Sequence, residues 1–587
     1  MPDKEQSDFN DNYLILNFIL SIRQNNRRQA SLLQPESGVL LSGGFIVSAF
    51  ILPYKKNTLN LASCVLIIGL VLFWSSSAVA RFNTQKFALG SGVITESSPT
   101  LADINNDGID DIIIGTLTKS PDGNVKGAFL IAMQGDGTIL WKKDVGAPVN
   151  SAPAVGDIDN DGDMEIIVSV GGDVSDPKHQ GGIKAFDHRG NLLWFFRTLD
   201  DYPADGYSNG VYSSPTLCDT DGNGTLEIAF GAWDRNIYLL DHNGHSLWNN
   251  MPGSGQIHQG FHNGDTSWST AACIDLNSDG NKEIVIGADI TGGGILPDGT
   301  HTQNGGFLYV FDKNGGILVR RYLPEAIYSS PAVADLNNDG TAEIVVGTSW
   351  NFWNQPPQGN PIPKVYVFDT SQVFGPLPYA DPAKLPDFPG WPQTTAYPGF
   401  SSPALADLDN NGDLEIIIGS GNPFTQQGQV LAWHHDGTAV TGWPITPKNG
   451  FGNNAHITSS PTVADIDGDG NNEVLFSMLW DIQVYNADGT LQQILPTNYT
   501  TAASPAIGDT NGDGKTDIWI GGGDIHEKTQ GYLWKFSGTT EELGKSPWPM
   551  FHKDSMNSGA FPFYNFTPSG PGNPTGGLPA CNLLLLR

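Results

Sequence analysis

The sequence predicts an all-β protein built as an eight-bladed β-propeller, in which four-stranded antiparallel sheets repeat around a central axis. Three observations predict this fold. An acidic phrase occurs eight times between residues 97 and 522, a short run rich in Ile and Val follows each copy, and a hairpin signal completes the units. Each unit must bury its apolar faces on its neighbours, so such a repeat fixes the architecture. A seven-bladed ring with one displaced unit is the structural alternative.

The first strand of each unit is predicted from a Ser-Pro segment such as "SAPAVGD" at 151–157. Proline stands at the start of this strand, where no ladder donor is needed. The small residues that follow suit inner strands that crowd around an axis. The fourth unit departs from the pattern by placing Ala271 where the others have proline.

A nine-residue acidic loop follows the first strand. Oxygen-bearing side chains stand at loop positions 1, 3, 5 and 9, and glycine at position 6 allows a sharp turn. Calcium takes six to eight oxygen ligands, and a tight turn can supply them. The residue type at position 7 varies freely, which is typical of a ligand that offers only its backbone carbonyl. A plain Asp/Asn/Gly turn is the alternative for a single loop, but eight copies with one spacing favour a metal.

We therefore predict up to eight calcium ions. The predicted ligands, unit by unit, are Asp103, Asn105, Asp107, Ile109, Asp111; Asp157, Asp159, Asp161, Asp163, Glu165; Asp219, Asp221, Asn223, Thr225, Glu227; Asp275, Asn277, Asp279, Asn281, Glu283; Asp335, Asn337, Asp339, Thr341, Glu343; Asp407, Asp409, Asn411, Asp413, Glu415; Asp465, Asp467, Asp469, Asn471, Glu473; and Asp509, Asn511, Asp513, Lys515, Asp517. An EF-hand is a poor fit, because its acidic residue falls at position 12 and helices flank its loop. The eighth loop, with Lys515, is expected to be among the weaker sites.

The second, third and fourth strands follow from the rest of each unit. Runs such as "EIIIGS" are apolar on both faces and too short for a helix, which predicts a strand buried on both faces. Alternating apolar residues around Asn-Gly or Asp-Gly, as in 236–248 and 482–494, then predict a hairpin. Each unit should therefore hold four antiparallel strands.

The repeated phrase Ser-Pro-x-x-x-Asp-x-Asn/Asp-x-Asp-Gly-x-x-Asp/Glu-Ile-x-x-Gly resembles the FG-GAP repeat of integrin α-subunit propellers and the related bacterial VCBS-type repeats. The resemblance covers about four-fifths of the chain and implies a calcium ion between the first and second strands of each matching blade. The chain departs from integrins in carrying a ligand set in all eight units and in mostly lacking the Phe-Gly pair. These departures favour the bacterial secreted branch.

Charge and cysteines narrow the function classes. A formal net charge of −32 and a pI near 4.5 argue against nucleic-acid binding, which needs a basic surface. The clustered carboxylates would repel one another without a metal, so the metal-free protein should be strained.

Cys218 and Cys273 precede the first Asp of their loops by one and two residues. Strand alternation then points them to opposite faces of their sheets and predicts two buried thiols rather than a disulfide.

The N-terminal residues 1–80 predict an export or membrane segment. Lys55-Lys56, the apolar run 61–74 and "SSSAVA" ending at Ala80 have the order of a secretory signal over 55–80. A second apolar stretch at 39–52 leaves open a later start or a retained membrane hairpin. We expect the propeller over 81–562 and a Pro/Gly-rich tail over 563–587. The protein should be secreted or at the cell surface, with membrane contact only through an uncleaved N-terminal segment.

Function is less determined than fold, since propellers host many activities. The first hypothesis is a non-enzymatic, calcium-dependent binding or adhesion module for a glycan or protein. The ligand-binding residues predicted for it are Tyr207, Trp350, Phe352 and Trp353, in long loops on the rim opposite the calcium loops. The alternative is a polysaccharide-active enzyme, because rhamnogalacturonan lyases include similar calcium-bearing propellers. No catalytic residue is assigned, since no Ser/His/Asp spacing is recognisable.

Overall fold

The computed structural model describes residues 82–561, apart from gaps at 91–93, 95, 120–124, 172–180, 199–208, 249–259, 264, 291–303, 351–361, 375–384, 423–424, 449–456, 458, 500 and 524–529. These residues belong to the second of two compact units, Phe82–Arg587. Among the described residues no helix has both the length and the apolar character needed to span a membrane.

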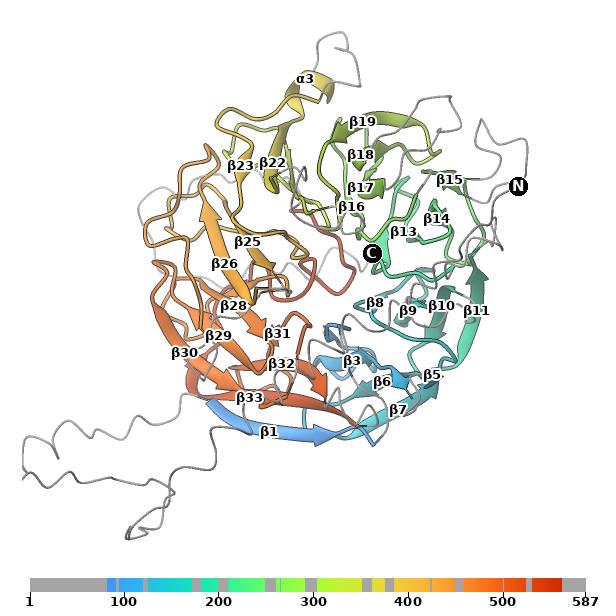
Figure 1. The fold of residues 1–587 in the computed structure, drawn as a ribbon. Coiled ribbons are helices and arrows are strands. Elements are labelled where there is room, and N and C mark those ends of the chain that lie inside the picture. The colour runs from blue at the N-terminus through green and yellow to red at the C-terminus, as the bar shows by residue number, and fades with distance from the viewer. Residues whose placement is uncertain are drawn as a thin grey trace, which may run out of the picture. The chain divides into compact units, whose positions relative to one another are not determined.

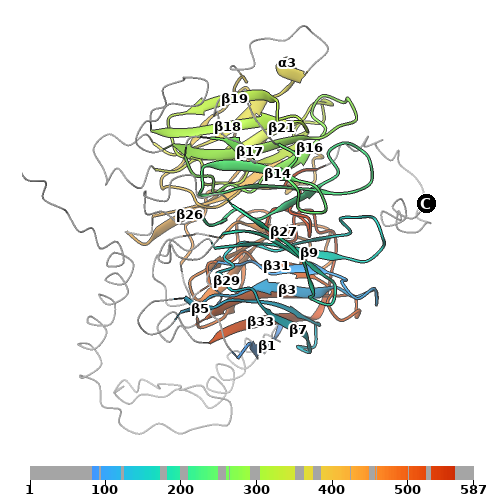
Figure 2. The ribbon, with the colours of Figure 1, turned by 90° about the vertical axis from the view of Figure 1, so that its right-hand side faces the viewer.

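Eight antiparallel sheets surround a central axis (Figure 1), so the predicted eight-bladed propeller is confirmed and the seven-bladed alternative is excluded. Figure 2 shows the molecule turned by 90°, so that successive blades are seen side by side from the edge of the ring. The strands of blades 1 to 4, from the axis outward, are β2 (Thr100–Ala102), β3 (Asp111–Gly115), β6 (Phe129–Met133) and β7 (Ile139–Asp144); β8 (Ala154–Gly156), β9 (Glu165–Val170), β10 (Gly182–Asp187) and β11 (Leu192–Arg197); β12 (Thr216–Cys218), β13 (Glu227–Gly231), β14 (Asn236–Leu240) and β15 (Phe261–His262); and β16 (Ala272–Ile274), β17 (Glu283–Ile290), β18 (Gly305–Phe311) and β19 (Ile317–Leu323). A side hairpin, β4 (Thr118–Lys119) with β5 (Val125–Gly127), extends blade 1.

Blades 5 to 8 follow the same plan with two variations. Their strands are β20 (Ala332–Ala334), β21 (Glu343–Gly347), β22 (Lys364–Asp369) and β23 (Gln393–Thr394), with the short helix α3 (Ser371–Phe374); β24 (Ala404–Ala406), β25 (Glu415–Asn422) and β26 (Gln427–Trp433); β27 (Thr462–Ala464), β28 (Glu473–Met478), β29 (Asp481–Tyr485) and β30 (Leu491–Pro496); and β31 (Ala506–Gly508), β32 (Lys515–Gly523), β33 (Gly531–Glu542) and β1 (Phe82–Ala88). In blade 6 the fourth strand is reduced to isolated bridges such as Val430–Ile445. In blade 8 the fourth strand is β1, so the two ends of the propeller close the ring together.

The Ser-Ser-Pro segment joins neighbouring blades through a ring of hydroxyl groups. The second hydroxyl accepts a hydrogen bond from the backbone N–H of the equivalent residue one blade earlier, as Ser402 does from Ser330 at 2.9 Å. Seven of the eight neighbouring pairs make this contact. At the remaining pair Ala152 has no hydroxyl, and Ser97 Oγ donates to Ser151 O instead. These buried polar groups are therefore satisfied between blades rather than within them.

A second set of contacts joins the outer parts of the blades. The indole Nε1 of a tryptophan in one blade donates to a hairpin carbonyl of the next blade, as from Trp194 to His242 O at 2.9 Å. Five blade pairs share this bond. Where blade 8 meets blade 1, the ammonium group of Lys535 takes this role and donates to Gly135 O at 3.0 Å.

The C-terminal segment 544–561 lies against the inner strands. Six of the eight inner strands donate the backbone N–H of their middle residue to carbonyl groups of this segment, as Leu217 does to Met556 O at 2.9 Å. The edges of the inner strands would otherwise be unpaired. Residues distant in sequence thus complete the centre of the ring.

The prediction of two free thiols was wrong. Cys218 and Cys273 form a disulfide with a Cα–Cα distance of 6.4 Å, within the usual range. The two cysteines lie on the inner strands of blades 3 and 4. In a ring of sheets, one face of each sheet packs against the opposite face of the next sheet. Side chains that point to opposite faces of two consecutive sheets therefore meet, and the alternation that was predicted to separate the thiols brings them together.

Candidate metal loops and the opposite rim

Each acidic loop is held in one conformation by its own carboxylates. In blade 2, Asp157 at position 1 accepts hydrogen bonds from the backbone N–H groups of Asp161 and Gly162 at 3.0 and 2.9 Å. Left-handed backbone occurs at position 4, where Asn160 has φ 61°, and at position 6, where Gly162 has φ 96°. Asparagine and glycine tolerate this region best. Position 4, which is Asn, Ser or Gly in all eight loops, is therefore part of the loop signature that our sequence analysis missed.

The position-9 carboxylate is buried beneath the loop. Glu343 is fully buried and Asp111 is 2 % exposed. One oxygen of Glu343 accepts from Leu336 N at 2.9 Å. Within the described residues its Oε1 and the Oδ2 of Asp111 have no hydrogen-bond partner. A buried carboxylate oxygen without a partner is costly, so both side chains fit a bound cation.

Burial also changes the protonation of this position. It is the largest cause that raises the pKa of Asp111, Glu165 and Glu283 to about 7, and the pKa of Glu343 and Glu473 to about 8. Repulsion by the neighbouring loop carboxylates acts in the same direction. A protein without cations in these loops therefore binds protons there near neutral pH.

The structure brings predicted ligands of positions 1, 3 and 9 together. In three loops one oxygen of each acidic residue lies within 4.8 Å of the others: Asp157, Asp159 and Glu165; Asp219, Asp221 and Glu227; Asp465, Asp467 and Glu473. The side chain at position 7 turns elsewhere in two loops. Asn281 Oδ1 accepts from Lys313 Nζ at 2.8 Å, and Asp413 pairs with His435 at 3.3 Å.

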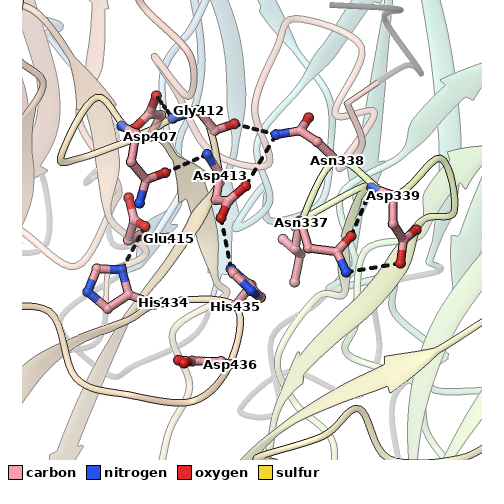
Figure 3. A network of polar contacts seen from close by, with 12 residues as sticks. Asn337, Asn338, Asp339, Asp407, Gly412, Asp413, Glu415, His434, His435 and Asp436 are labelled. Atoms are coloured by element: carbon pink, nitrogen blue, oxygen red, sulfur yellow. Dashed lines mark hydrogen bonds and ion pairs between the residues drawn. The ribbon is translucent and has the colours of Figure 1, made fainter.

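Blade 6 adds a histidine that the sequence analysis did not select. Figure 3 shows His434 against Glu415 and His435 against Asp413. Asp409, Glu415 and His434 form another group of ligand atoms within 4.8 Å. His434 begins the hairpin turn after β26, where the consecutive histidines of "WHHDG" were the only available signal. In the same view, Asn338 donates to Gly412 O, which links the loops of blades 5 and 6.

Blade 8 supplies its own cation. Lys535 Nζ lies 2.9 Å from Asp517 Oδ2, and both side chains are almost completely buried. Ser537 Oγ donates to the other carboxylate oxygen at 2.6 Å. Lys515, the residue that suggested a weaker site, instead donates to Thr539 O at 2.7 Å. The position-9 carboxylate of this blade is thus neutralised by a lysine that stands on the third strand.

The rim opposite the acidic loops holds the inter-blade connections and the turns between second and third strands. Trp350 lies there and is half-buried, next to Ser349, which pairs with Ala326 of the preceding connection. The other residues predicted to bind ligand, Tyr207, Phe352 and Trp353, lie outside the described residues.

The fold and loops define an eight-bladed propeller with one acidic loop in each blade. The family model of the lambda-carrageenase beta-propeller domain matches residues 122–356, and that of the FG-GAP-like repeat matches residues 407–476. Integrin alpha-3 of Mus musculus is 28% identical over 144 residues, which are 23% of this chain and 12% of the integrin. Integrin alpha-7 of Mus musculus is 30% identical over 173 residues, 27% of this chain and 14% of the integrin. The chain therefore matches only a small part of the length of these integrins.

Two solved structures resemble this chain at low sequence identity. The V. cholerae biofilm matrix protein Bap1 has a TM-score of 0.49 and 14% identity, over 79% of this chain and 92% of that chain. The Dos1 propeller has a TM-score of 0.44 and 12% identity, over 78% and 98%. The repeats, the family models and the integrin matches agree. Together they support an FG-GAP-type, integrin-α-like β-propeller.

The raised pKa values predict how pH acts on the protein in EDTA. A carboxyl group whose folded pKa exceeds its unfolded value binds more protons in the folded state, so stability falls as pH rises. The free energy of unfolding in EDTA should decrease between about pH 5 and pH 8. In calcium this loss should disappear, because metal binding requires the ionised form. Thermal melting at several pH values in EDTA and in calcium measures both slopes; a metal-free protein that gains stability over this range contradicts the prediction.

Proposed function

We propose that this protein is a secreted or cell-surface binding module whose propeller is stabilised by up to eight calcium ions. The observation that carries the proposal is the buried position-9 carboxylate, which in Asp111 and Glu343 has an oxygen without a partner in the described residues. Calcium prefers oxygen ligands, and three of the loops gather carboxylates of positions 1, 3 and 9 within 4.8 Å of one another. When bound, the ion would supply the positive charge that these groups lack.

The blades differ in what they offer the ion. Blades with only oxygen donors fit calcium best. Blade 8, where Lys535 already neutralises Asp517, should be the weakest site. The loops would hold calcium through positions 1, 3, 5 and 9, with the backbone carbonyl of position 7.

The ligand is proposed to be an extracellular glycan or protein bound on the rim opposite the acidic loops. Similarity to a lambda-carrageenase propeller domain over residues 122–356 supports a polysaccharide, and similarity to integrins supports an adhesive role. The same carrageenase match keeps a polysaccharide-active enzyme as the second candidate. We assign no catalytic residue to it.

Two substitutions separate a calcium ligand from an internal ion pair. Glu343→Gln should lower the number of bound calcium ions by one and reduce the gain in Tm on adding calcium. In EDTA this variant should not be destabilised, because a glutamine oxygen can still accept from Leu336 N and the other carboxylate oxygen, Oε1, has no partner to lose among the described residues. Asp517→Asn should lower Tm equally with and without calcium, since it leaves the buried Lys535 without its anion. Metal analysis by mass spectrometry and melting curves give these values; an unchanged ion count in Glu343→Gln would refute this site.

The binding proposal is tested on arrays of glycans and extracellular proteins, with calcium and with EDTA. We expect binding that depends on calcium and that Trp350→Ala weakens without a change in Tm. A drop in Tm of several degrees with unchanged binding per folded molecule would show that Trp350 only packs. The enzyme candidate is tested by incubating the protein with carrageenans and measuring new reducing ends or unsaturated products.

Export is proposed from the basic–apolar–Ala-x-Ala order of residues 55–80. The mature chain should begin at Arg81, which places the whole described propeller outside the cell. Mass spectrometry of the native protein gives its N-terminus. Peptides from residues 1–54 in that sample would contradict cleavage.

A further inference from the structure

Five aromatic rings of blades 3 to 6 form one continuous row, here named the aromatic arc: Tyr212, Trp233, Trp268, Tyr328 and Phe400. Tyr212 stacks on Trp233 with ring centroids 5.8 Å apart, and Trp268 contacts these two rings at 4.9 and 4.8 Å. Tyr328 follows at 5.7 Å from Trp268, and Phe400 at 5.5 Å from Tyr328. The row thus passes across three blade boundaries without a break.

Four members of the aromatic arc occupy the same position of the repeat, directly before the first residue of the Ser-Ser or Ser-Thr pair. The inner strand runs from this position to the acidic loop. The arc therefore lies at the ends of the inner strands that are remote from the metal loops. The equivalent residues of blades 1, 2 and 8 are Glu96, Asn150 and Ala502, so these blades do not extend the aromatic row.

The aromatic arc offers both apolar faces and polar atoms. Tyr212, Trp268 and Phe400 are partly exposed, while Trp233 and Tyr328 are 6 % and 8 % exposed. Core packing between blades does not require such rings, because the four other blades have polar or small residues at this position, namely Glu96, Asn150, Thr458 and Ala502. The indole Nε1 of Trp233 is buried and has no hydrogen-bond partner among the described residues, so the polar atoms that a ligand can reach are those of the partly exposed members.

Charge around the aromatic arc selects among ligands. Asp234 follows Trp233 directly. Behind Trp268, the indole donates to Thr266 Oγ1, and Thr266 in turn donates to the buried carboxylate of Asp289 at 2.6 Å. Glu325, three residues before Tyr328, is fully buried and paired with Lys364 at 3.1 Å. These acidic side chains are buried, and they lie near the rings in a chain of formal net charge −32, which disfavours ligands that carry sulfate or uronate groups.

We propose that the aromatic arc binds a chain of neutral hexoses, whose flat C–H faces stack on Tyr212, Trp268 and Phe400. The proposal rests on the proposed binding function and gives that function a position and a ligand class. Partly exposed aromatic rings in a contiguous row are typical of an interaction site. Several rings in one row match an extended chain better than a single sugar.

The test compares Trp268 variants with a matched tryptophan on the opposite rim. Trp194 is also half-buried and lies in the hairpin of blade 2, on the side of the acidic loops. Calorimetric titrations use calcium-loaded protein and four hexaoses: cellohexaose, mannohexaose and agarohexaose, which are neutral, and a sulfated carrageenan hexaose. Trp268→Ala should weaken binding of the neutral hexaose at least tenfold, Trp268→Phe should retain most of it, and Trp194→Ala should leave it unchanged. Melting curves confirm that each variant is folded.

The outcomes are distinct. Neutral-sugar binding that survives both Trp268→Ala and Tyr212→Ala would overturn the arc as the site and leave the binding function standing. Binding of only the sulfated hexaose would overturn the neutral ligand class. No binding of any hexaose by the wild-type protein would overturn the arc proposal; if the arrays of glycans and proteins also found no ligand, the proposed binding function would fail too.

Discussion

Closure of the ring is the constraint on which the rest of this structure depends. A sheet that is apolar on both faces needs a neighbouring sheet on each side. Blade 8 must therefore pack against blade 1 as closely as the other neighbouring blades pack against each other. The chain meets this requirement by adding β1 to blade 8 and by continuing the hydroxyl ring from Ser504 to Ser98. Lys535 then replaces the indole contact that five other boundaries make. Closure also sets the acidic loops at one common rim.

The acidic loops couple this fold to its proposed metal. The position-9 residue begins the second strand of blades 1 to 7 and lies near the start of that strand in blade 8, so it is buried as soon as the blades pack. An ionised carboxyl group there needs a positive partner. Six loops leave that partner to a proton or a cation, whereas blade 6 places His434 3.0 Å from Glu415 and blade 8 uses Lys535 at 2.9 Å. The same residue therefore serves ring closure and charge neutralisation, which explains why an almost completely buried lysine is tolerated.

Much of the fold and of the candidate metal site could be predicted because it depends on local sequence. Loop positions 1, 5 and 6 interact with one another within five residues, as Asp157 does with Asp161 and Gly162. Side-chain contacts between neighbouring strands were beyond the reach of the sequence. His434 meets Glu415 across nineteen residues, and Lys535 meets Asp517 because two strands of one blade pair. Neither contact leaves a signal in the spacing of the acidic phrase.

The sequence by itself predicted eight blades and placed an acidic loop between the first and second strands of each blade. These features repeat at short range, where backbone geometry and the alternation of side chains decide the outcome. The tertiary structure alone decided which faces meet. It joined Cys218 to Cys273, and it aligned aromatic rings such as Trp268 and Tyr328 from separate repeats. Their proximity follows from the rotation between neighbouring blades, a quantity that no single repeat encodes.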